Sequence, residues 1–586
     1  MLERNEKIIK RKMLQYILPG IMLTAALQVG NVVDSMLVGN LLGPDAMSAV
    51  KIGMAVDNIV ELPGYVLGVG GSVAAGIFMG NRETEKAKKV FSTTFLISLL
   101  FGLIFAALSV GSGYYAKWLC GGSSLVADAE SFIFVTMLIA PVLSAALQLI
   151  NYVAVDNNPT LASVYVITAN VLNLTLDYVL LKFTDLGTAG AALSTGLGYG
   201  IALFLMIFYV RSKKRMLSFV NPFGDMKPHL LAALKAGIPT LLYMIFLTIK
   251  DMSLNTMIIK MVGETAMIIY TVCFNATLCV QMCAGGIVGL LSNMGSVLYG
   301  KRDFFGIKRL IRHLLRYSYI VLGVFMVVML AKPGLFLGFF GVTDAATAVP
   351  GAAALRIYTL ALPFYLWNHF MMVYYQSTDK TVLSSIITSL QTCVAIVPLA
   401  FVFVIAAKAW GLDTLNAMVL SFVFSEIVTI VITFVYQRIK YKKQSYFMLP
   451  KHEEETVDFT VNGDPDQINE TIDMIFNYCK DRDIPRKTAN RMAMVTEEIL
   501  YNVFRQGNAE NADVAMYVVG GTLSLRLTDD GVPFNPLEYK PEENEPVTQE
   551  LDTIKLIASR TEYLRVIDLN YTTIEIDTKT LMNQPA

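Results

Sequence analysis

Charged residues are scarce in this 586-residue chain. Asp, Glu, Lys and Arg make up 16% of it, against about 25% in an ordinary soluble protein. The four histidines and six cysteines show no zinc-ligand spacing, and the cysteines are too sparse for a small disulfide-stapled domain. These absences exclude a zinc site, a disulfide framework and a soluble enzyme over most of the length.

Apolar residues are correspondingly abundant: they make up 54% of the chain, and its mean hydropathy is +0.53. Residues 1–450 contain 34 Lys and Arg against 21 Asp and Glu, whereas residues 451–586 contain 13 against 26. Two stretches of opposite net charge predict two environments, a membrane part followed by a soluble part. The first apolar run lacks a small-residue cleavage site, so we expect it to be a retained span.

Twelve apolar runs are long enough to cross a bilayer, which takes about 20 helical residues. They are approximately 13–37, 46–79, 90–111, 129–152, 159–182, 189–210, 234–260, 266–298, 308–331, 350–376, 381–407 and 412–437. Basic residues gather in the N-terminal tail and after the second, sixth, eighth and twelfth runs. Basic loops stay in the cytoplasm, so we expect a multi-pass protein of the cell membrane with both termini cytoplasmic.

The two halves of the membrane part repeat each other at an offset of about 220 residues. The clearest pairs are Pro19 and Pro239, Gly80 and Gly300, Pro141 and Pro363, and Gly187 and Gly411. A repeat of six spans preserves orientation, so it predicts an all-α membrane protein of two six-helix bundles, arranged as parallel repeats around a central cavity. The expected domains are the bundles 1–215 and 216–443 and a soluble domain 444–586.

The soluble domain reads as alternating strands and helices. We expect strands at VDFTV, 512–519, 522–528, YLRVIDL and YTTIEID, and helices at about 464–482, 486–507 and 552–560. This pattern predicts an α/β sandwich of about 130 residues, which is large enough for its own core.

A few ionisable side chains lie inside the predicted spans, where each is costly and indicates a function. Asn173 and Asp177 are four residues apart and share a helix face. Asp34 and Thr195 fall at a similar depth in the first and sixth spans. Carboxylates with amide and hydroxyl oxygens predict a Na⁺ or H⁺ site, and the alternative is that these residues are helix-end groups near water or bond to neighbouring helices.

A second acidic pair lies in the middle of the second span. Asp57 and Glu61 are four residues apart, just before Pro63, and are expected to line the cavity and attract cationic cargo. The alternative is a buried pair satisfied by Lys250 or by water. The candidate ionisable residues of the second half are Lys250, Asp251, Arg356, His369 and Glu426.

The segments VVDSMLVGNLLG, GNRETEKAKKV, DNNPTLA, NVLNLTLDYVL and LGTAGAALST, with the half-to-half repeat, resemble the MATE (multidrug and toxic compound extrusion) transporters. The resemblance covers residues 1–440 and implies ion-coupled export. Members with a cation site in the first bundle use an Asp in span 1, an Asn and an Asp in span 5 and a Thr in span 6. These positions match Asp34, Asn173, Asp177 and Thr195.

The segments MAMVTEEILYNVFRQG and LTDDGVPFNPLEY resemble the GHKL-type (Bergerat-like) ATPase domain of anti-sigma-factor kinases. The resemblance implies that Glu498 is the general base, that Asn502 holds Mg²⁺, and that Asp529 with Gly531 binds the adenine amino group of ATP. The family's glycine-rich lid is missing, because residues 548–553 read TQELDT and carry two acids that would repel phosphate. We therefore expect weak or absent ATPase or serine-kinase activity.

These observations predict an antiporter that exports amphipathic organic cations in exchange for Na⁺ or H⁺, with a regulatory C-terminal domain that binds nucleotide or a cytoplasmic protein. The lipid bilayer and small organic cations are the expected partners, and nucleic acid is not. The alternative is a membrane-anchored signalling protein whose C-terminal domain acts as a kinase or docking module. A lipid-precursor flippase of related architecture is a third reading, but few basic residues lie in mid-span.

Overall fold

A computed structural model describes residues 2–42, 44–120, 126–156, 159–204, 206–211, 215–339, 345–441, 446–449, 456–519, 521–538, 558–566 and 568–577. The chain divides into two compact units. The larger unit is Gln15–Phe447, and the smaller unit joins Met1–Leu14 to Met448–Ala586. The first fourteen residues therefore fold with the C-terminal part of the chain, whereas the sequence placed them with the first bundle.

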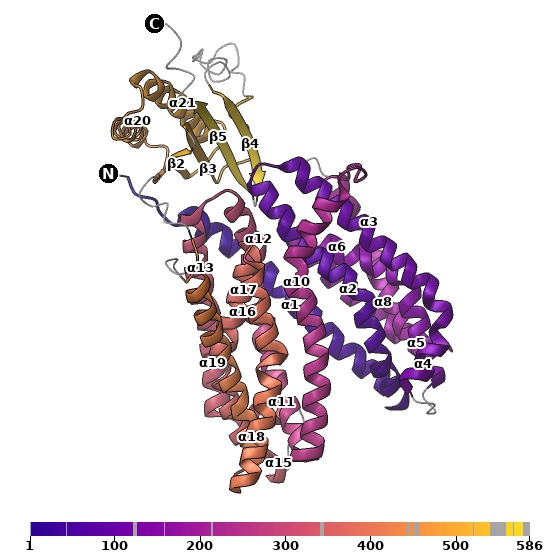
Figure 1. The fold of residues 1–586 in the computed structure, drawn as a ribbon. Helices are drawn as coiled ribbons and strands as arrows, with labels where there is room; N and C mark the ends of the chain where they lie inside the picture. Colours follow the sequence, from indigo (N-terminus) through magenta and orange to yellow (C-terminus); the bar gives the residue numbers. More distant parts are fainter. Residues whose placement is uncertain are drawn as a thin grey trace. The chain divides into compact units, whose positions relative to one another are not determined.

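The regular elements of the larger unit, among its described residues, are all helices, as its long apolar runs predict (Figure 1). The helices of the first half are α1 (Lys7–Leu42), α2 (Pro44–Gly80), α3 (Thr84–Leu108), η1 (Ser109–Gly111), α4 (Ser112–Cys120), α5 (Val126–Leu138), α6 (Ala140–Val155), α7 (Pro159–Phe183), α8 (Thr188–Leu203) and α9 (Met206–Arg211).

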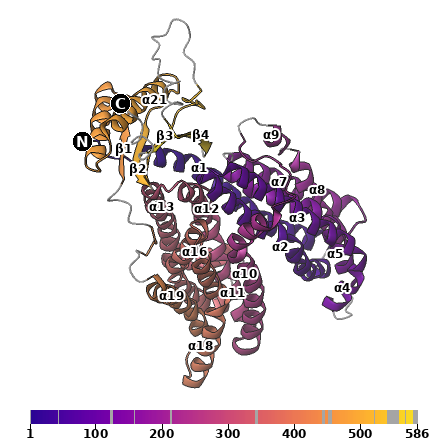
Figure 2. The ribbon, with the colours of Figure 1, turned by 45° about the horizontal axis from the view of Figure 1, so that its top comes forward.

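The helices of the second half form a separate group beside those of the first (Figure 2). They are α10 (Met226–Met257), η2 (Ile258–Val262), α11 (Glu264–Val280), η3 (Gln281–Gly285), α12 (Gly286–Gly300), α13 (Phe304–Ala331), α14 (Pro333–Phe339), α15 (Ala345–Thr359), α16 (Leu362–Ser377), α17 (Thr381–Ser389), η4 (Leu390–Val394), α18 (Ile396–Trp410) and α19 (Thr414–Tyr441).

Each of the twelve predicted runs falls on one helix or on consecutive helices. Among the described residues, seven helices are long and apolar enough to cross a membrane, or up to nine if each of two bent pairs counts as one span. The larger unit is thus a multi-pass membrane protein, and the number of twelve spans stays a prediction.

The two bent helices carry the paired prolines of the repeat. Helices α5 and α6 meet at 55° and Pro141 opens α6, while α15 and α16 meet at 42° and Pro363 opens α16. Proline is tolerated in the first turn of a helix, but it breaks the backbone hydrogen bonding with the turn before it. Both bends therefore have the same cause.

Other paired positions share a positive φ angle. Arg82 and Arg302, in the turns after α2 and α12, have φ angles of 67° and 56°. Gly187 and Gly411 have φ angles of 55° and 66°. A left-handed conformation is uncommon in a non-glycine residue, so its recurrence at matched arginines supports the internal repeat.

Helices of the two halves approach each other backbone to backbone at three glycine pairs. The pairs are Gly80 of α2 with Gly300 of α12, Gly70 of α2 with Gly237 of α10, and Gly20 of α1 with Gly286 of α12. A Cβ at Gly80 would lie 2.6 Å from Gly300 Cα, and one at Gly70 would lie 2.6 Å from Gly237 Cα. Such contact requires small residues, as is typical of packed membrane helices.

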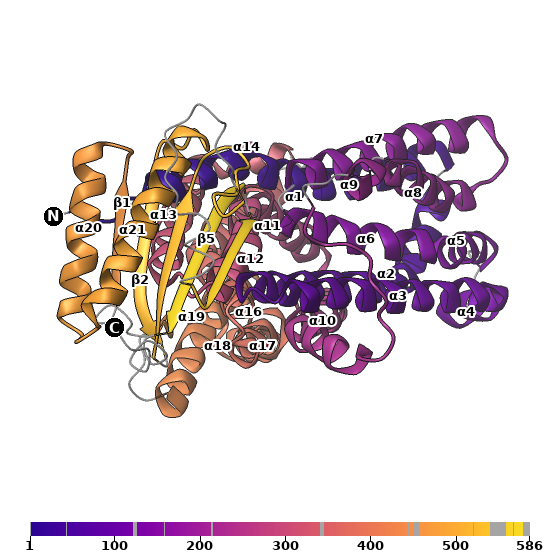
Figure 3. The same cartoon turned by 90° about the horizontal axis from the view of Figure 1, so that it is seen from above.

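The smaller unit contains a five-stranded antiparallel sheet in the order β1-β2-β3-β5-β4, with two helices packed against it (Figure 3). Its elements are β1 (Val457–Val461), α20 (Pro465–Lys480), α21 (Arg486–Arg505), β2 (Ala512–Val519), β3 (Thr522–Asp529), β4 (Arg560–Val566) and β5 (Leu569–Asp577). The predicted strands and the first two helices are confirmed within a few residues, and most of the predicted helix 552–560 lies outside the described residues.

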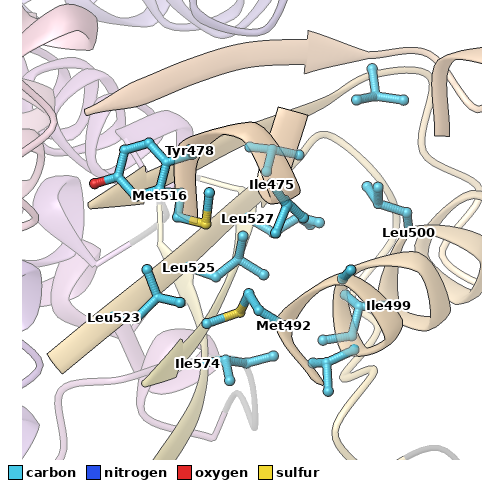
Figure 4. Packing of buried hydrophobic residues seen from close by; sticks show 14 of the residues in the cluster. Ile475, Tyr478, Met492, Ile499, Leu500, Met516, Leu523, Leu525, Leu527 and Ile574 are labelled. Atoms are coloured by element: carbon cyan, nitrogen blue, oxygen red, sulfur yellow. The ribbon is translucent and has the colours of Figure 1, made fainter. Parts of the chain in front are cut away.

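Both helices of this unit are amphipathic and bury one face on the sheet. Ile475 of α20 and Met492 and Ile499 of α21 face Leu525 and Leu527 of β3 in one buried cluster (Figure 4). Alternate residues of β3 point into this core, as the period of a strand requires. The unit therefore has a hydrophobic core of its own.

The glycine pairs generate a stability prediction. Gly80→Ala forces the new Cβ onto the Val297 carbonyl oxygen and Gly300 Cα, so we expect a loss of about 1–3 kcal/mol from overpacking. Gly323→Ala in α13 is the control, because no atom lies within 4 Å of its Cβ position. Thermal unfolding of the purified protein in detergent measures both variants, and equal melting temperatures would contradict the packing described.

Candidate functional site

Helix α8 packs closely on α7 because small residues recur every four positions along one of its faces. Those residues are Gly190, Ser194 and Gly198. A Cβ on Gly198 would lie 2.9 Å from the Asn173 backbone nitrogen, so only glycine fits there without a shift. The close approach brings polar side chains of the two helices into hydrogen-bonding range.

Those polar side chains form a buried cluster between α7 and α8. The Ser194 hydroxyl donates to Oδ1 of Asp177, and Asn173 Nδ2 donates to Ser194 Oγ at 3.3 Å and to Thr195 Oγ1 at 3.1 Å. Asp177 and Ser194 are fully buried and Asn173 is 7% exposed. The carboxylate therefore accepts from a hydroxyl that belongs to a hydrogen-bonded cluster within an apolar helix pair.

The donor set of this cluster suits a small cation. It combines a carboxylate, an amide carbonyl and two hydroxyls, which are the oxygen types that bind hard metal ions. The same carboxylate can carry a proton. Exchange of either ion at Asp177 would change the charge of the cluster and the hydrogen bonds that join α7 to α8.

Three of the four predicted ion-site residues, Asn173, Asp177 and Thr195, are brought together by the structure. The side chain of the fourth, Asp34, lies outside the described residues. Sequence reasoning missed Ser194, which holds the carboxylate directly. Its position midway between Gly190 and Gly198 is the signal that could have identified it.

The predicted cargo residues lie on α2. Asp57 and Glu61 are half-buried and lie one helical turn apart. Both are close enough to Tyr199 on α8 to interact with it electrostatically. The alternative partner Lys250 lies instead 3.3 Å from Asp251. Two carboxylates near a tyrosine make an anionic, aromatic surface of the kind that attracts organic cations.

The second half holds a buried carboxylate of its own. Glu426 of α19 is 7% exposed, and its Oε2 accepts from Asn368 Nδ2 at 2.7 Å and from Gln391 Nε2 at 3.1 Å. Gln391 belongs to the π-helical turn η4 that interrupts the α17–α18 helix, and such turns often mark functional positions. The sequence singled out Glu426 as an ionisable residue in a span but gave it no partners.

The residues of the predicted nucleotide motif come from two segments of the smaller unit. Asn502 Nδ2 donates to Glu498 Oε1 at 2.9 Å on α21, and the Gly507 backbone N–H donates to the Asn502 carbonyl at 3.1 Å. A Cβ on Gly531 would lie 2.3 Å from the Gly507 carbonyl oxygen. The end of α21 thus lies against the Asp529–Gly531 turn, and glycine is required at their contact.

Asp529, the last residue of β3, is 1% exposed. Its Oδ1 accepts from the Gly531 backbone N–H at 3.0 Å and from Asn570 Nδ2 at 2.7 Å. Its Oδ2 has no hydrogen-bond partner among the described residues. Burial raises the pKa of Asp529 to about 6, against the opposing effect of these two hydrogen bonds.

An unpartnered buried carboxylate oxygen is costly, and a ligand that donates an N–H group would satisfy it. Residues 548–553, where the glycine-rich lid is missing, lie outside the described residues. No group of three or more His, Cys, Asp or Glu within the described ranges could hold a metal ion.

Comparison with solved structures decides the fold of the larger unit. A MOP superfamily transporter from Pyrococcus furiosus superposes with a TM-score of 0.66 at 18% sequence identity, covering 74% of this chain and 96% of that one. The outward-facing conformation of a multidrug resistance MATE family transporter superposes with a TM-score of 0.66 at 19% identity, covering 75% of this chain and 97% of that one.

The larger unit has the MATE transporter fold. Residues 19–179 also match the MatE family model. The predicted family resemblance of the membrane part is thereby supported, whereas nothing in these comparisons concerns the GHKL resemblance of the smaller unit.

Sequence relatives of this MATE-fold chain include named exporters. The multidrug export protein MepA of Staphylococcus haemolyticus is 22% identical over 272 residues, which is 46% of this chain and 60% of MepA. The probable multidrug resistance protein YoeA of Bacillus subtilis is 24% identical over 342 residues, which is 56% of this chain and 72% of YoeA. The first of these alignments thus spans less than two thirds of the relative.

The raised pKa of Asp529 generates a pH prediction. The folded state binds this proton more tightly than the unfolded state, because its pKa is about 6 rather than 3.8. Ionisation therefore destabilises the unit as the pH rises through this window, by about 3 kcal/mol once both states are ionised. Asp529→Asn removes that penalty, so its stability relative to the natural protein should rise from pH 4 to pH 7.

Hydrogen exchange of β3 and β5 amides in the full-length protein, corrected for the intrinsic rate at each pH, measures this difference. Asp473→Asn on the exposed face of α20 is the control and should show no such trend. A stability difference between Asp529→Asn and the natural protein that is constant with pH would contradict the burial effect.

Proposed function

We propose that this chain is a secondary antiporter that exports amphipathic, cationic organic solutes in exchange for Na⁺ or H⁺. The observation that carries the proposal is the fully buried carboxylate of Asp177 between two helices of a MATE fold, where it accepts from Ser194, which in turn accepts from Asn173. A carboxylate is expensive in a membrane protein's interior and indicates an ion or proton pathway.

The coupling follows from the geometry of the cluster. Binding of a cation or proton at Asp177 neutralises the charge between α7 and α8 and changes which hydroxyls and amides bond across them. The pair then repacks, and alternating access follows when the first bundle changes shape against the second. The energy comes from the ion gradient.

The proposed cargo site uses the acidic surface on α2. Asp57 and Glu61 provide negative charge, and Tyr199 provides an aromatic face for the organic part of the cargo. The names of the relatives, multidrug export and multidrug resistance proteins, support organic cargo. We therefore assign drug-like cations to this chain as part of the proposal.

The smaller unit is proposed to be a regulatory module that binds a nucleotide such as ATP. The Asp529 Oδ2 atom fits an N–H donor of a nucleobase, and Glu498 and Asn502 offer carboxylate and amide oxygens for Mg²⁺. Mg²⁺ held there would neutralise phosphate charge of bound ATP. Asp529→Asn should abolish binding of labelled ATP to the full-length protein, because the acceptor oxygen is replaced by an N–H₂ group.

The test of antiport is export of a fluorescent cationic dye from proteoliposomes under an imposed Na⁺ or H⁺ gradient. Asp177→Asn keeps the acceptor for Ser194 but cannot ionise, so we expect export to fall at least about tenfold. Ser194→Ala should reduce export less, by about two- to tenfold, because a neutral hydrogen-bond donor is lost.

Asp185→Asn is the matched control, since this carboxylate is exposed in the turn between α7 and α8. It should export dye at the rate of the natural protein. Antiport through this cluster is rejected if Asp177→Asn also exports at that rate, or if the natural protein exports dye without a gradient of either ion.

A further inference from the structure

Helix α13 turns one row of side chains outward from the larger unit. The side of the helix that packs on the bundle consists of buried apolar residues, namely Ile307, Leu310, Leu314 and Leu322. The outward row advances in steps of three or four residues, as neighbours on a helix surface do. Its exposed members are Lys308, Arg312, Arg316, Ile320, Val324 and Val327. We call these six residues the α13 row.

The α13 row changes its chemistry along its length. Its first three members are basic, and the three that follow are aliphatic and 56–67% exposed. Only 22% of the apolar stretch of α13 is buried within the protein. In a membrane protein such an aliphatic surface faces lipid chains, so the basic side chains of the same row lie where this surface meets the lipid headgroups.

The uncharged part of α13 is too short to cross a bilayer by itself. Residues 317–331, between Arg316 and Lys332, contain no Asp, Glu, Lys or Arg. They extend about 22 Å as a helix, whereas the hydrocarbon core of a bilayer is roughly 30 Å thick. Side chains of a helix point toward its N-terminus, so Arg316 can reach back to the headgroups, whereas Lys332 has to lie at the headgroups itself. Arg316 is thereby drawn to the boundary between hydrocarbon and headgroups.

The first half of the chain provides an internal comparison. Helix α3 is the counterpart of α13, because each follows a turn with a left-handed arginine. At the repeat offset of about 220 residues, Ser92 and Leu96 stand where α13 has Arg312 and Arg316. The two arginines are therefore not required by the scaffold that the halves share.

The basic residues that α3 does contain are matched by carboxylates of this chain. The pairs are Lys86 with Glu83 at 2.7 Å, Lys88 with Glu85 at 2.8 Å, and Lys89 with Asp225 at 2.9 Å. Helix α13 contains no Asp or Glu, and Asp303 before it is buried and accepts from the Gly306 backbone N–H as a helix cap. An anionic lipid can supply the negative charge that this helix lacks.

We propose that the basic part of the α13 row binds the headgroup of an anionic phospholipid. Arginine pairs with phosphate through two parallel hydrogen bonds, and basic residues beside a bilayer attract anionic lipid. Lys308 and Arg316 are about 12 Å apart along the axis, so their long side chains can converge on one headgroup with that of Arg312 between them. The acyl chains then lie on the aliphatic part of the row.

A lipid fits the α13 row better than a soluble anion does. A free phosphate would occupy the basic part and leave the aliphatic part bare, whereas a phospholipid covers both. The inference rests on the membrane-spanning character of the larger unit and does not depend on the proposed transport function.

The test counts the lipids that the purified full-length protein binds. Native mass spectrometry in a non-ionic detergent follows binding of phosphatidylglycerol, which is anionic, and of phosphatidylcholine, which is zwitterionic. The natural protein should prefer phosphatidylglycerol, and added salt should weaken that binding. Arg312→Gln combined with Arg316→Gln should bind phosphatidylglycerol at least about tenfold more weakly, because two of the three charges are lost.

Further variants separate the α13 row from general charge and from folding. Lys86→Gln combined with Lys88→Gln removes the same charge from α3 and should bind phosphatidylglycerol as the natural protein does. Arg312→Lys combined with Arg316→Lys keeps the charge and should retain most of the binding. If thermal unfolding shows that the glutamine variant is not folded, Lys308→Gln at the exposed start of the row replaces it, with an expected loss of about fivefold.

Unchanged binding of phosphatidylglycerol by the glutamine variant would overturn the proposal. Equal binding of the two lipids by the natural protein would overturn it as well, because net charge would then play no part. An equal loss in the α3 variant would show that any positive charge serves. Displacement of the lipid by free glycerol phosphate would show a site for soluble anions, and a dimer that dissociates in the glutamine variant would show that a second copy covers the row; each of these results contradicts the proposal.

Discussion

The buried carboxylate of Asp177 is the constraint on which the rest of the first bundle depends. A charge at this depth has to be matched by hydrogen-bond donors or by a bound cation, and the Ser194 hydroxyl, which itself accepts from Asn173, is positioned for that purpose. Ser194 reaches it because Gly198, one turn further along α8, lets the backbones of α7 and α8 approach closely. The polar cluster therefore depends on close packing of the two helices, and that packing depends on small residues.

The same principle recurs in the second bundle with different residues. Glu426 is buried on α19 and is satisfied by the amides of Asn368 and Gln391. The two halves share their proline bends, their left-handed turns and their glycine approaches, yet each places its carboxylate on a different helix. The two halves thus share a backbone arrangement but differ in their polar clusters, which is consistent with different roles for the two halves.

Much of this fold could be predicted from the sequence, because hydropathy and periodicity are local properties. The strands at 457–461 and 512–519 and the half-to-half repeat, with its pair Pro141 and Pro363, could be predicted in this way. Asn173 and Asp177 could be placed on one face because they are four residues apart. The family resemblance of the membrane part supplied Thr195.

The rest could not be predicted, because it depends on contacts between distant segments. Ser194 reads in sequence as one more small packing residue, and only the crossing of α7 and α8 places its hydroxyl on Asp177. Arg4 reads as a positive charge near the cytoplasmic face, yet its partners Asp458 and Asp513 lie more than 450 residues away. Local patterns contain no information on such pairs.

Antiport requires that cargo and coupling ion compete for the transporter, and calorimetry measures this competition directly. Binding of a cationic dye to the purified protein should release protons, which is seen as a binding heat that varies with the ionisation enthalpy of the buffer. Alternatively, the dye affinity should fall as Na⁺ is added. The account predicts one of these two dependences in the natural protein and its loss in Asp177→Asn. Dye affinity that is independent of both pH and Na⁺ would contradict it.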